Sequence, residues 1–290
     1  MNQIKHSEMN EMLDQMNQLI RQTCVSSLDS NNDLTRAVEF HLNLSGSQSR
    51  AQLCLSASLA LGLETHDAVR LAAAVECLHN ASLIQDDLQD GDTHRRGRPA
   101  IWHKYGANTA INTTDLMIAS AFALVVSVDG GSHAVRLVSI MQRAIAITLQ
   151  GQTRDLNSLG SSDLKYSLSV AEEKSGPLFA LSLELPLIVS YHDDFLEDAR
   201  QAGSCLGAGY QIIDDLQDSS RDQKSENSAN LVLIMERTLN KRDAEIQAEA
   251  LASHYLQQAA ELASRLPSSC AELLIGQCNN LLSNLAREAA

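Results

Sequence analysis

The chain has 290 residues, of which 44% are hydrophobic and 3% aromatic, with only 4 prolines. Long stretches are rich in Ala, Leu, Ser, Gln and Glu, and runs of Val, Ile and Tyr are scarce, which favours an all-α fold with one sizeable core. The net charge of -14 argues against non-specific binding to nucleic acid.

The six cysteines form no CxxC pair, so the sequence predicts buried free thiols and neither a zinc site nor a redox motif. The polar N-terminus lacks an apolar signal core, and no apolar run reaches membrane-spanning length. We therefore expect a cytoplasmic protein without integral membrane association.

Apolar residues at helical spacing from Met9 to Ile20 predict a first amphipathic helix, and a second helix should run to about Leu44. Proline removes a backbone donor, so Gly176-Pro177 predicts a kink or break. We expect one domain, residues 1–290, of roughly ten helices. The remaining helices are predicted over 50–62, 66–90, 107–127, 132–155, 168–191, 195–218 and 228–264, and from Pro267 to the C-terminus.

The pentapeptide Asp-Asp-Leu-Gln-Asp occurs twice, at 86–90 and at 214–218. Asp86 and Asp90 are four residues apart and share a helix face, with Asp87 beside them. Three carboxylates at a helix C-terminus repel one another and the helix dipole, and a cation would relieve this repulsion. A single such cluster is more often a solvated helix end, but two identical clusters favour Mg²⁺ binding. The candidate ligands are Asp86, Asp87, Asp90, Asp214, Asp215 and Asp218.

Segment 76–90, followed by Arg95-Arg96-Gly97-Arg98-Pro99, resembles the first aspartate-rich region of the trans-isoprenyl diphosphate synthases, the polyprenyl synthetase family. Segment 209–218 is similar to the second such region. Between them, Gly151-Gln152 with Asp155-Leu156, and Lys174-Ser175-Gly176, resemble further family elements, so that the resemblance spans about residues 40–235. It implies a helical bundle of the isoprenoid synthase type with a central apolar cavity, assembled as a homodimer.

The resemblance also implies residue roles. The six aspartates would bind Mg²⁺, about three ions with diphosphate present. The implied catalytic residues are Asp86, Asp87, Asp90, Lys174, Asp214 and Asp215. Arg95, Lys174, Ser175 and Gln211 would hold an allylic diphosphate, and Arg50, His79 and Arg96 would hold isopentenyl diphosphate. Taken alone, His79 is equally a core histidine, Lys174 a solvated residue and Gln211 a helix cap.

The sequence departs from the family where Ser47 replaces a lysine that binds isopentenyl diphosphate, although Arg50 remains. The loop after the second cluster is shortened, and its lysine, Lys224, lies only six residues beyond Asp218. We expect elongation of an allylic diphosphate with isopentenyl diphosphate. A class I terpene synthase or cyclase, which needs no isopentenyl site, is the alternative, and a non-catalytic subunit of a heteromeric synthase ranks last.

Product length should depend on the residues that precede Asp86 on its helix. Leu78, Ala81 and Ser82 lie eight, five and four positions before it and should line the pocket for the growing chain. In the family, aromatic residues at the last two of these positions stop growth near C15. Because both are small here, we expect a C20 product, with Leu78 or Phe122 as the pocket floor.

Overall fold

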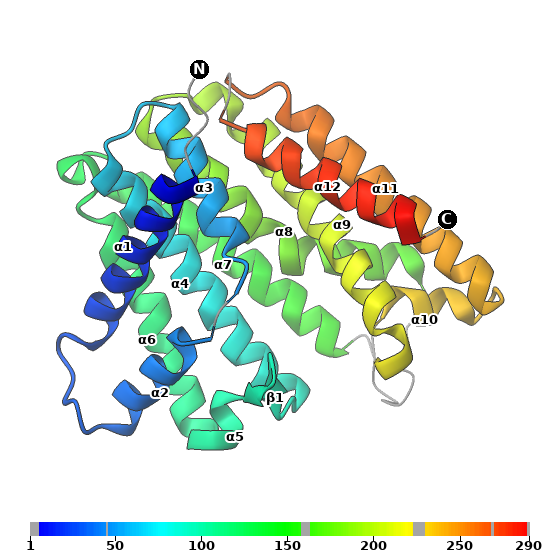
Figure 1. Cartoon of the computed structure of the whole chain (residues 1–290), viewed down its shortest axis with the longest axis horizontal. Coiled ribbons are helices and arrows are strands. Elements are labelled where there is room, and N and C mark those ends of the chain that lie inside the picture. The colour runs from blue at the N-terminus through cyan, green and yellow to red at the C-terminus, as the bar shows by residue number, and fades with distance from the viewer. Residues whose placement is uncertain (1–5, 45, 158–162, 223–229, 268–269, 289–290) are drawn as a thin grey trace. The chain divides into compact units, whose positions relative to one another are not determined.

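The computed structural model describes residues 6–44, 46–157, 163–222, 230–267 and 270–288 (Figure 1). These residues are helical almost throughout, so the predicted all-α fold class is confirmed. The α-helices are α1 His6–Val25, α2 Asp33–Leu42, α3 Ser49–Ala60, α4 Thr65–Asp90, α5 Ile101–Tyr105, α6 Ala107–Val125, α7 Ala134–Asn157, α8 Leu164–Val189, α9 Leu196–Asp222, α10 Leu231–Glu236, α11 Lys241–Ala263 and α12 Glu272–Glu288. Two short 3-10 helices, η1 Val128–Gly131 and η2 Asp193–Phe195, precede α7 and α9.

The chain divides into two compact units. Unit 1 consists of Met1–Met141 and Leu185–Tyr191, and unit 2 of Gln142–Glu184 and His192–Ala290. Both α7 and α8 run through the boundary, so each unit contains part of these two helices. Our prediction of one domain over residues 1–290 stays a prediction.

Helix α4 forms the centre of unit 1, where α1, α3, α5 and α6 pack against it. Its first half is buried on nearly every side, because apolar residues occupy all faces from Ala68 to Leu78. From His79 onward, half-buried positions appear, and the last two residues, Gln89 and Asp90, are exposed. Gly91, in the left-handed conformation at φ 74°, ends the helix directly after Asp90. The fold thus delivers the first aspartate cluster to the surface from a buried helix.

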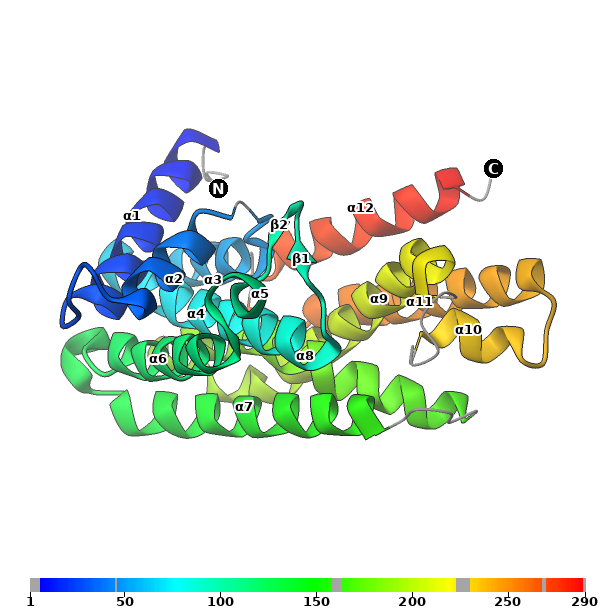
Figure 2. The same ribbon diagram turned by 90° about the horizontal axis from the view of Figure 1, so that it is seen from below.

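A hairpin that the sequence analysis did not predict follows α4 (Figure 2). Strand β1 His94–Arg95 pairs antiparallel with β2 Arg98–Pro99. The two residues between the strands, Arg96 and Gly97, have φ values of 51° and 75°, as a tight two-residue hairpin turn requires. Helix α5 was also missed, because it is only five residues long.

Helix α8 is continuous through Gly176-Pro177, so a break there is wrong, whereas a kink stays a prediction. Helix α9 packs closely against α8 at this point. A Cβ on Gly176 would lie 2.7 Å from the Ser204 Cα, and one on Gly207 would lie 2.5 Å from the Gly176 backbone nitrogen. Backbone therefore meets backbone at this crossing, and these contacts outweigh the intrinsic preference of proline to end a helix.

Two predicted helix boundaries in unit 2 are also wrong. The predicted helix over 228–264 is two helices, because Asn240 accepts a hydrogen bond from the Asp243 backbone N–H and caps a new helix there. The last helix begins at Glu272 rather than at Pro267. The cysteines are free thiols, and all except the half-buried Cys205 are buried, as expected.

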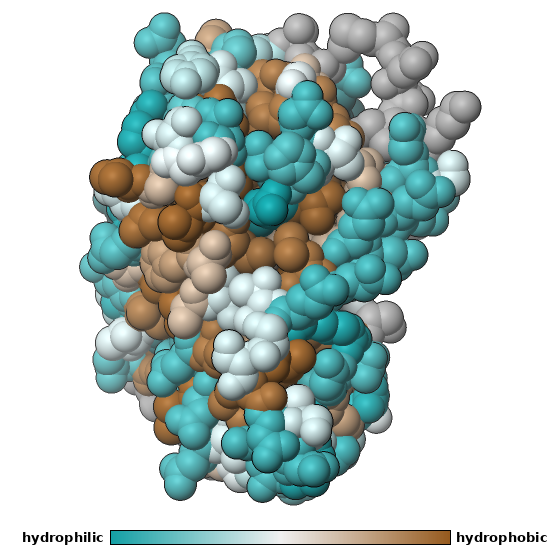
Figure 3. Space-filling model, turned by 90° about the vertical axis from the view of Figure 1, so that its left-hand side faces the viewer, coloured by the Kyte–Doolittle hydropathy of each residue, from teal (hydrophilic) through white to brown (hydrophobic). Residues whose placement is uncertain are grey.

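The surface carries apolar as well as polar side chains, and Figure 3 shows apolar residues gathered on one face of the molecule. Among the described residues, no helix is both long and apolar enough to cross a bilayer. The large apolar side chains with the greatest exposure include Ile111 on α6, Val126 just after it, and Val135 on α7, the last of which is 84% exposed.

The packing of α8 against α9 gives a first prediction. Gly207→Ala should destabilise the protein by about 1–3 kcal/mol, because its new methyl group would overlap the α8 backbone. The matched control is Gly276→Ala in α12, where nothing lies within 4 Å of an added Cβ. This control should be neutral or stabilising by about 1 kcal/mol. Denaturant unfolding measures both, and equal effects of the two substitutions would contradict the packing argument.

Candidate functional site

The first aspartate cluster, at the end of α4, is divided between exposed and buried carboxylates. Asp90 is exposed and Asp86 half-buried, whereas Asp87 is buried. Arg95 on the hairpin donates to both Asp87 oxygens from Nε, at 2.8 and 2.9 Å, and its Nη2 lies 2.6 Å from Oδ1. Burial raises the pKa of Asp87, and these hydrogen bonds oppose the rise. The ion pair therefore attaches the hairpin to the end of α4.

Cationic and histidine side chains gather beside this cluster within unit 1. Arg50 on α3 donates from Nη1 to His79 Nε2 on α4, at 3.4 Å. Gly46 lies against the guanidinium of Arg96, since a Cβ there would be 2.4 Å from Nη1. Arg95 and Arg96 are both near enough to His79 to lower its pKa electrostatically. We call Arg50, His79, Arg95 and Arg96 the arginine–histidine cluster.

Three further residues support this cluster and were missed from the sequence. His41 on α2 lies with Nε2 2.9 Å from Asn80 Oδ1. The Asn80 amide donates to the Glu76 carbonyl oxygen at 2.7 Å, one turn earlier on α4. Burial raises the pKa of Glu76, and the charge of Arg50 opposes this rise. Glu76 and Asn80 stand at helical spacing beside His79 and could have been noticed, but no sequence signal connects His41 to them.

The segment before α3 contributes no cation at position 47. Ser47 is exposed, and its carbonyl accepts a hydrogen bond from the Gln52 side chain. Gln48 has a φ of 49° at the helix N-terminus. No other residue of this turn is a lysine, so nothing here supplies the charge of the family lysine that Ser47 replaces.

In unit 2, the second aspartate cluster repeats the division seen in the first. Asp214 is exposed and Asp215 buried. Asp215 accepts hydrogen bonds from the Leu231 backbone N–H at 2.9 Å and from Gln211 Nε2 at 3.0 Å. Burial raises its pKa to about 7 against these bonds. The side chain of Asp218 and the whole of Lys224 lie outside the described residues.

The other predicted residues of unit 2 form two connected pairs. Ser175 donates to Gln211 Oε1 at 3.2 Å, which joins α8 to α9 and, through Gln211, to Asp215. Lys174 Nζ donates to Asp155 Oδ2 on α7 at 2.8 Å. Gly151 permits this approach, since a Cβ there would be 2.5 Å from the Lys174 backbone nitrogen. Gly151 and Asp155 thus place Lys174.

The residues predicted to set product length lie in unit 1. Leu78 and Ala81 are buried, at 3% and 2% exposure. Ser82 and Phe122 are half-buried, and the Ser82 hydroxyl donates to the His79 carbonyl at 2.8 Å. Their role as pocket lining stays a prediction.

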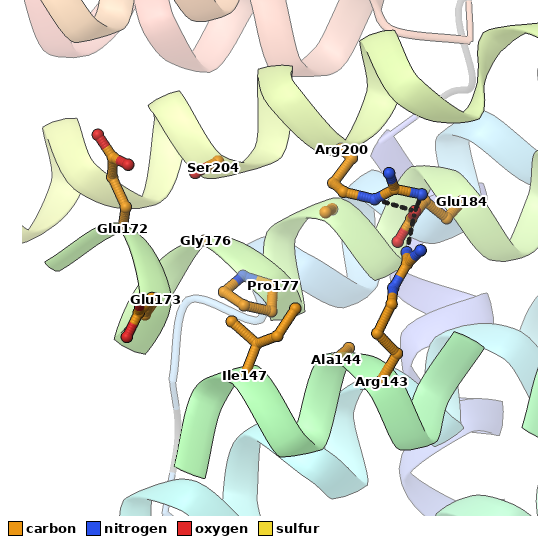
Figure 4. Close-up of a pocket in the computed structure, with 11 residues that line it drawn as sticks. Arg143, Ala144, Ile147, Glu172, Glu173, Gly176, Pro177, Glu184, Arg200 and Ser204 are labelled. Atoms are coloured by element: carbon orange, nitrogen blue, oxygen red, sulfur yellow. Dashed lines mark hydrogen bonds and ion pairs between the residues drawn. The ribbon is translucent and has the colours of Figure 1, made fainter. Parts of the chain in front are cut away.

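A pocket in unit 2 contains none of the predicted residues other than Gly176 of the Lys-Ser-Gly element. It measures about 160 Å³ and lies among α7, α8 and α9, with Ile147 and Pro177 on its walls (Figure 4). At one end the buried Glu184 accepts hydrogen bonds from Arg143 at 2.7 Å and from Arg200 at 3.2 Å. Because both arginines already hold a carboxylate, this triad is structural.

The carboxylate oxygens of the aspartate clusters are ligands that fit Mg²⁺, and the geometry limits how many of them can bind one ion. Among the described residues, no three His, Cys, Asp or Glu side chains converge to hold an ion by themselves. Asp87 and Asp215 also have firm protein partners. Mg²⁺ commonly takes one or two carboxylates and completes its octahedron with water and substrate phosphates. The more accessible Asp86, Asp90 and Asp214 suit that mode of binding.

Comparison with known proteins identifies the family. The polyprenyl synthetase family model matches residues 31–230, more than half of the chain. The chain belongs to the polyprenyl synthetase family. It is 32% identical over 194 residues to a geranylgeranyl pyrophosphate synthase of Geoglobus acetivorans, covering 64% of this chain and 60% of that protein. It is also 32% identical over 223 residues to a geranylgeranyl diphosphate synthase of Saccharolobus solfataricus, covering 74% and 66% respectively.

The fold is shared with solved structures. A geranylgeranyl pyrophosphate synthetase of Pyrococcus horikoshii superposes with a TM-score of 0.84 at 21% identity, covering 95% of this chain and 97% of that one. The predicted isoprenoid-synthase type of fold is therefore confirmed. The matched sequence spans only three fifths to two thirds of the length of the two curated relatives.

The unequal environments of the two neighbouring aspartates in unit 2 give a second prediction. Asp215→Ala should lower stability by about 1–3 kcal/mol, because the buried Leu231 N–H and Gln211 amide lose their acceptor. Asp214→Ala, at an exposed position, should leave stability within about 0.5 kcal/mol. Thermal unfolding compares the two variants, and equal losses would show that the buried hydrogen bonds of Asp215 do not stabilise α10.

Proposed function

We propose that this member of the polyprenyl synthetase family is a Mg²⁺-dependent prenyltransferase that condenses isopentenyl diphosphate with an allylic diphosphate. The observation that carries the proposal is the arginine–histidine cluster beside the aspartates of α4. Three neighbouring guanidinium groups, of the half-buried Arg50 and Arg95 and the exposed Arg96, suit a polyanionic ligand, because Arg binds phosphate oxygens bidentately.

In this proposal, Arg95, Lys174, Ser175 and Gln211 bind the allylic diphosphate, and Arg50, His79 and Arg96 bind isopentenyl diphosphate. Bound Mg²⁺, held by the six aspartates of the two clusters, would supply charge neutralisation of the departing diphosphate. The bond from the allylic carbon to the diphosphate oxygen breaks, the isopentenyl double bond attacks that carbon, and one proton leaves the adduct. The protein contributes positioning and charge stabilisation rather than a covalent nucleophile.

The names of the curated relatives support a product of C15 or C20. The two described above are geranylgeranyl diphosphate synthases, which agrees with a C20 product for this chain, and other matching relatives are farnesyl diphosphate synthases. Ala81 and Ser82 support the same length, because neither is large enough to block a growing chain at that depth. A product of C10 is the least favoured by this argument.

The terpene synthase alternative rests on Ser47, since an enzyme that ionises its substrate alone needs no isopentenyl site. The contact between Arg50 and His79 favours elongation instead, because two of the three predicted isopentenyl ligands are held together in unit 1. A non-catalytic subunit would not need two complete aspartate clusters, so we rank it last.

We further propose a homodimer that functions in the cytoplasm. Ile111 on α6 is 49% exposed and Val135 on α7 is 84% exposed, and such side chains commonly become buried in a subunit interface. Neither proposal affects the chemistry above.

A product assay tests the proposed function. The protein with Mg²⁺ and a C5, C10, C15 or C20 allylic diphosphate should form longer diphosphates only when isopentenyl diphosphate is added. Asp86→Ala and Asp214→Ala should each abolish this turnover without loss of helical structure by circular dichroism. Hydrocarbons or alcohols formed without isopentenyl diphosphate would instead support the terpene synthase, and no turnover in any mixture would support the subunit.

Product length gives a separate prediction. Ala81→Phe should shorten the main product, because an aromatic ring in a lined pocket blocks the path of the growing chain. Ser82→Phe, at a half-buried position that tolerates added volume better, should act in the same direction. Chromatography of the dephosphorylated products measures the chain length. A C10 or C15 wild-type product that neither substitution changes would rule out this pocket.

A further inference from the structure

The arginine–histidine cluster contains a histidine whose hydrogen bonding shows its protonation state. A guanidinium group has only donors, so Arg50 donates to His79 Nε2, and this nitrogen carries no proton. His79 is therefore neutral in the free protein, with its proton on Nδ1. A ligand that draws the Arg50 donors toward itself would leave Nε2 able to take up a proton.

The charged and titratable neighbours of His79 come from every part of unit 1 that faces it. Arg50 approaches from α3, Arg96 and Arg95 from the hairpin, and His41 from α2. Glu76, one turn earlier on the same helix, has Arg50 as its nearest cationic influence. Burial is the largest cause that lowers the pKa of His79, and the three arginines lower it further. His79 is thus a base held neutral first by burial and then by the positive charge of the three arginines.

A bound diphosphate would reverse this electrostatic balance. Its negative charges neutralise the arginines and add an attraction for a protonated imidazole, and both effects raise the pKa of His79. A protonated Nε2 would then donate to a phosphate oxygen. The contact would replace, in part, the cationic donor that a lysine at position 47 would have supplied.

We propose that diphosphate binding to the arginine–histidine cluster is coupled to the uptake of one proton from solvent by His79. The inference rests on the proposed function in so far as isopentenyl diphosphate is the ligand. Between the pKa values of His79 in the free and bound proteins, only the complex holds the proton. Affinity is therefore highest at the acid end of that window, and Kd rises up to about tenfold per pH unit toward the alkaline end.

The test is isothermal titration with isopentenyl diphosphate alone, and in parallel with inorganic pyrophosphate. Without an allylic partner, elongation cannot occur. Titrations between about pH 6 and pH 8, in buffers of different ionisation enthalpy, give the number of protons taken up once the protons that each free ligand itself carries are subtracted. We expect net uptake that approaches one proton inside the window between the free and bound pKa values of His79. His79→Gln should lose this uptake, whereas His66→Gln should retain it, because His66 lies on an exposed face with Asp67 as its neighbour.

Nitrogen NMR of histidine-labelled protein gives an independent readout. His79 should change from the neutral Nδ1–H form to the doubly protonated form as ligand is added. Binding without proton uptake would overturn this inference and leave the proposed function intact. Uptake that persists in His79→Gln would overturn the assignment to His79. Failure of both ligands to bind would overturn the inference and the elongation proposal together.

Discussion

The ion pair between Asp87 and Arg95 is the contact that fixes the hairpin, on which two members of the arginine–histidine cluster lie, to the end of α4. It joins a buried carboxylate in the last turn of α4 to the first strand of the hairpin. A cation in this place also opposes the negative end of the helix dipole and the neighbouring carboxylates. Because Arg96 directly follows Arg95 as the first residue of the tight hairpin turn, fixing Arg95 constrains where Arg96 can lie. Its guanidinium then comes to rest on Gly46.

The second aspartate has the same structural role in both Asp-Asp-Leu-Gln-Asp segments. Asp87 binds a hairpin arginine, and Asp215 accepts the first backbone N–H of α10. Both side chains are buried, whereas the first aspartate of each segment is half-buried or exposed. Identical pentapeptides thus combine a buried second carboxylate, held by a protein partner, with a more accessible first carboxylate. Sequence alone cannot distinguish these tasks, because they depend on partners 8 and 16 residues further along the chain.

Local patterns in the sequence predicted most helices, but they did not predict the changes that tertiary contacts impose on those helices. The helix over 66–90 was predictable because its apolar residues and Gly91 leave little choice. Gly176-Pro177 misled the prediction, since the glycines that let α9 approach α8 lie almost 30 residues away. Among the site residues, Arg50 and His79 were predicted from the family resemblance, whereas His41 was not. Its contact with Asn80 spans 39 residues and obeys no periodicity.

The positive charges of the arginine–histidine cluster in unit 1 are partly balanced by neighbouring side chains. Three arginines next to one another repel, and each needs a partner that does not occupy the ligand's place. Arg95 has Asp87, and Arg50 has the neutral ring of His79. A lysine at position 47 would add a permanent fourth charge and raise the repulsion in the free protein. A histidine adds its charge only when a polyanion has made that charge favourable, so the free protein avoids the repulsion that a fixed cation would impose. The replacement of lysine by Ser47, together with His79 among the arginines, is consistent with a site whose positive charge increases with its ligand.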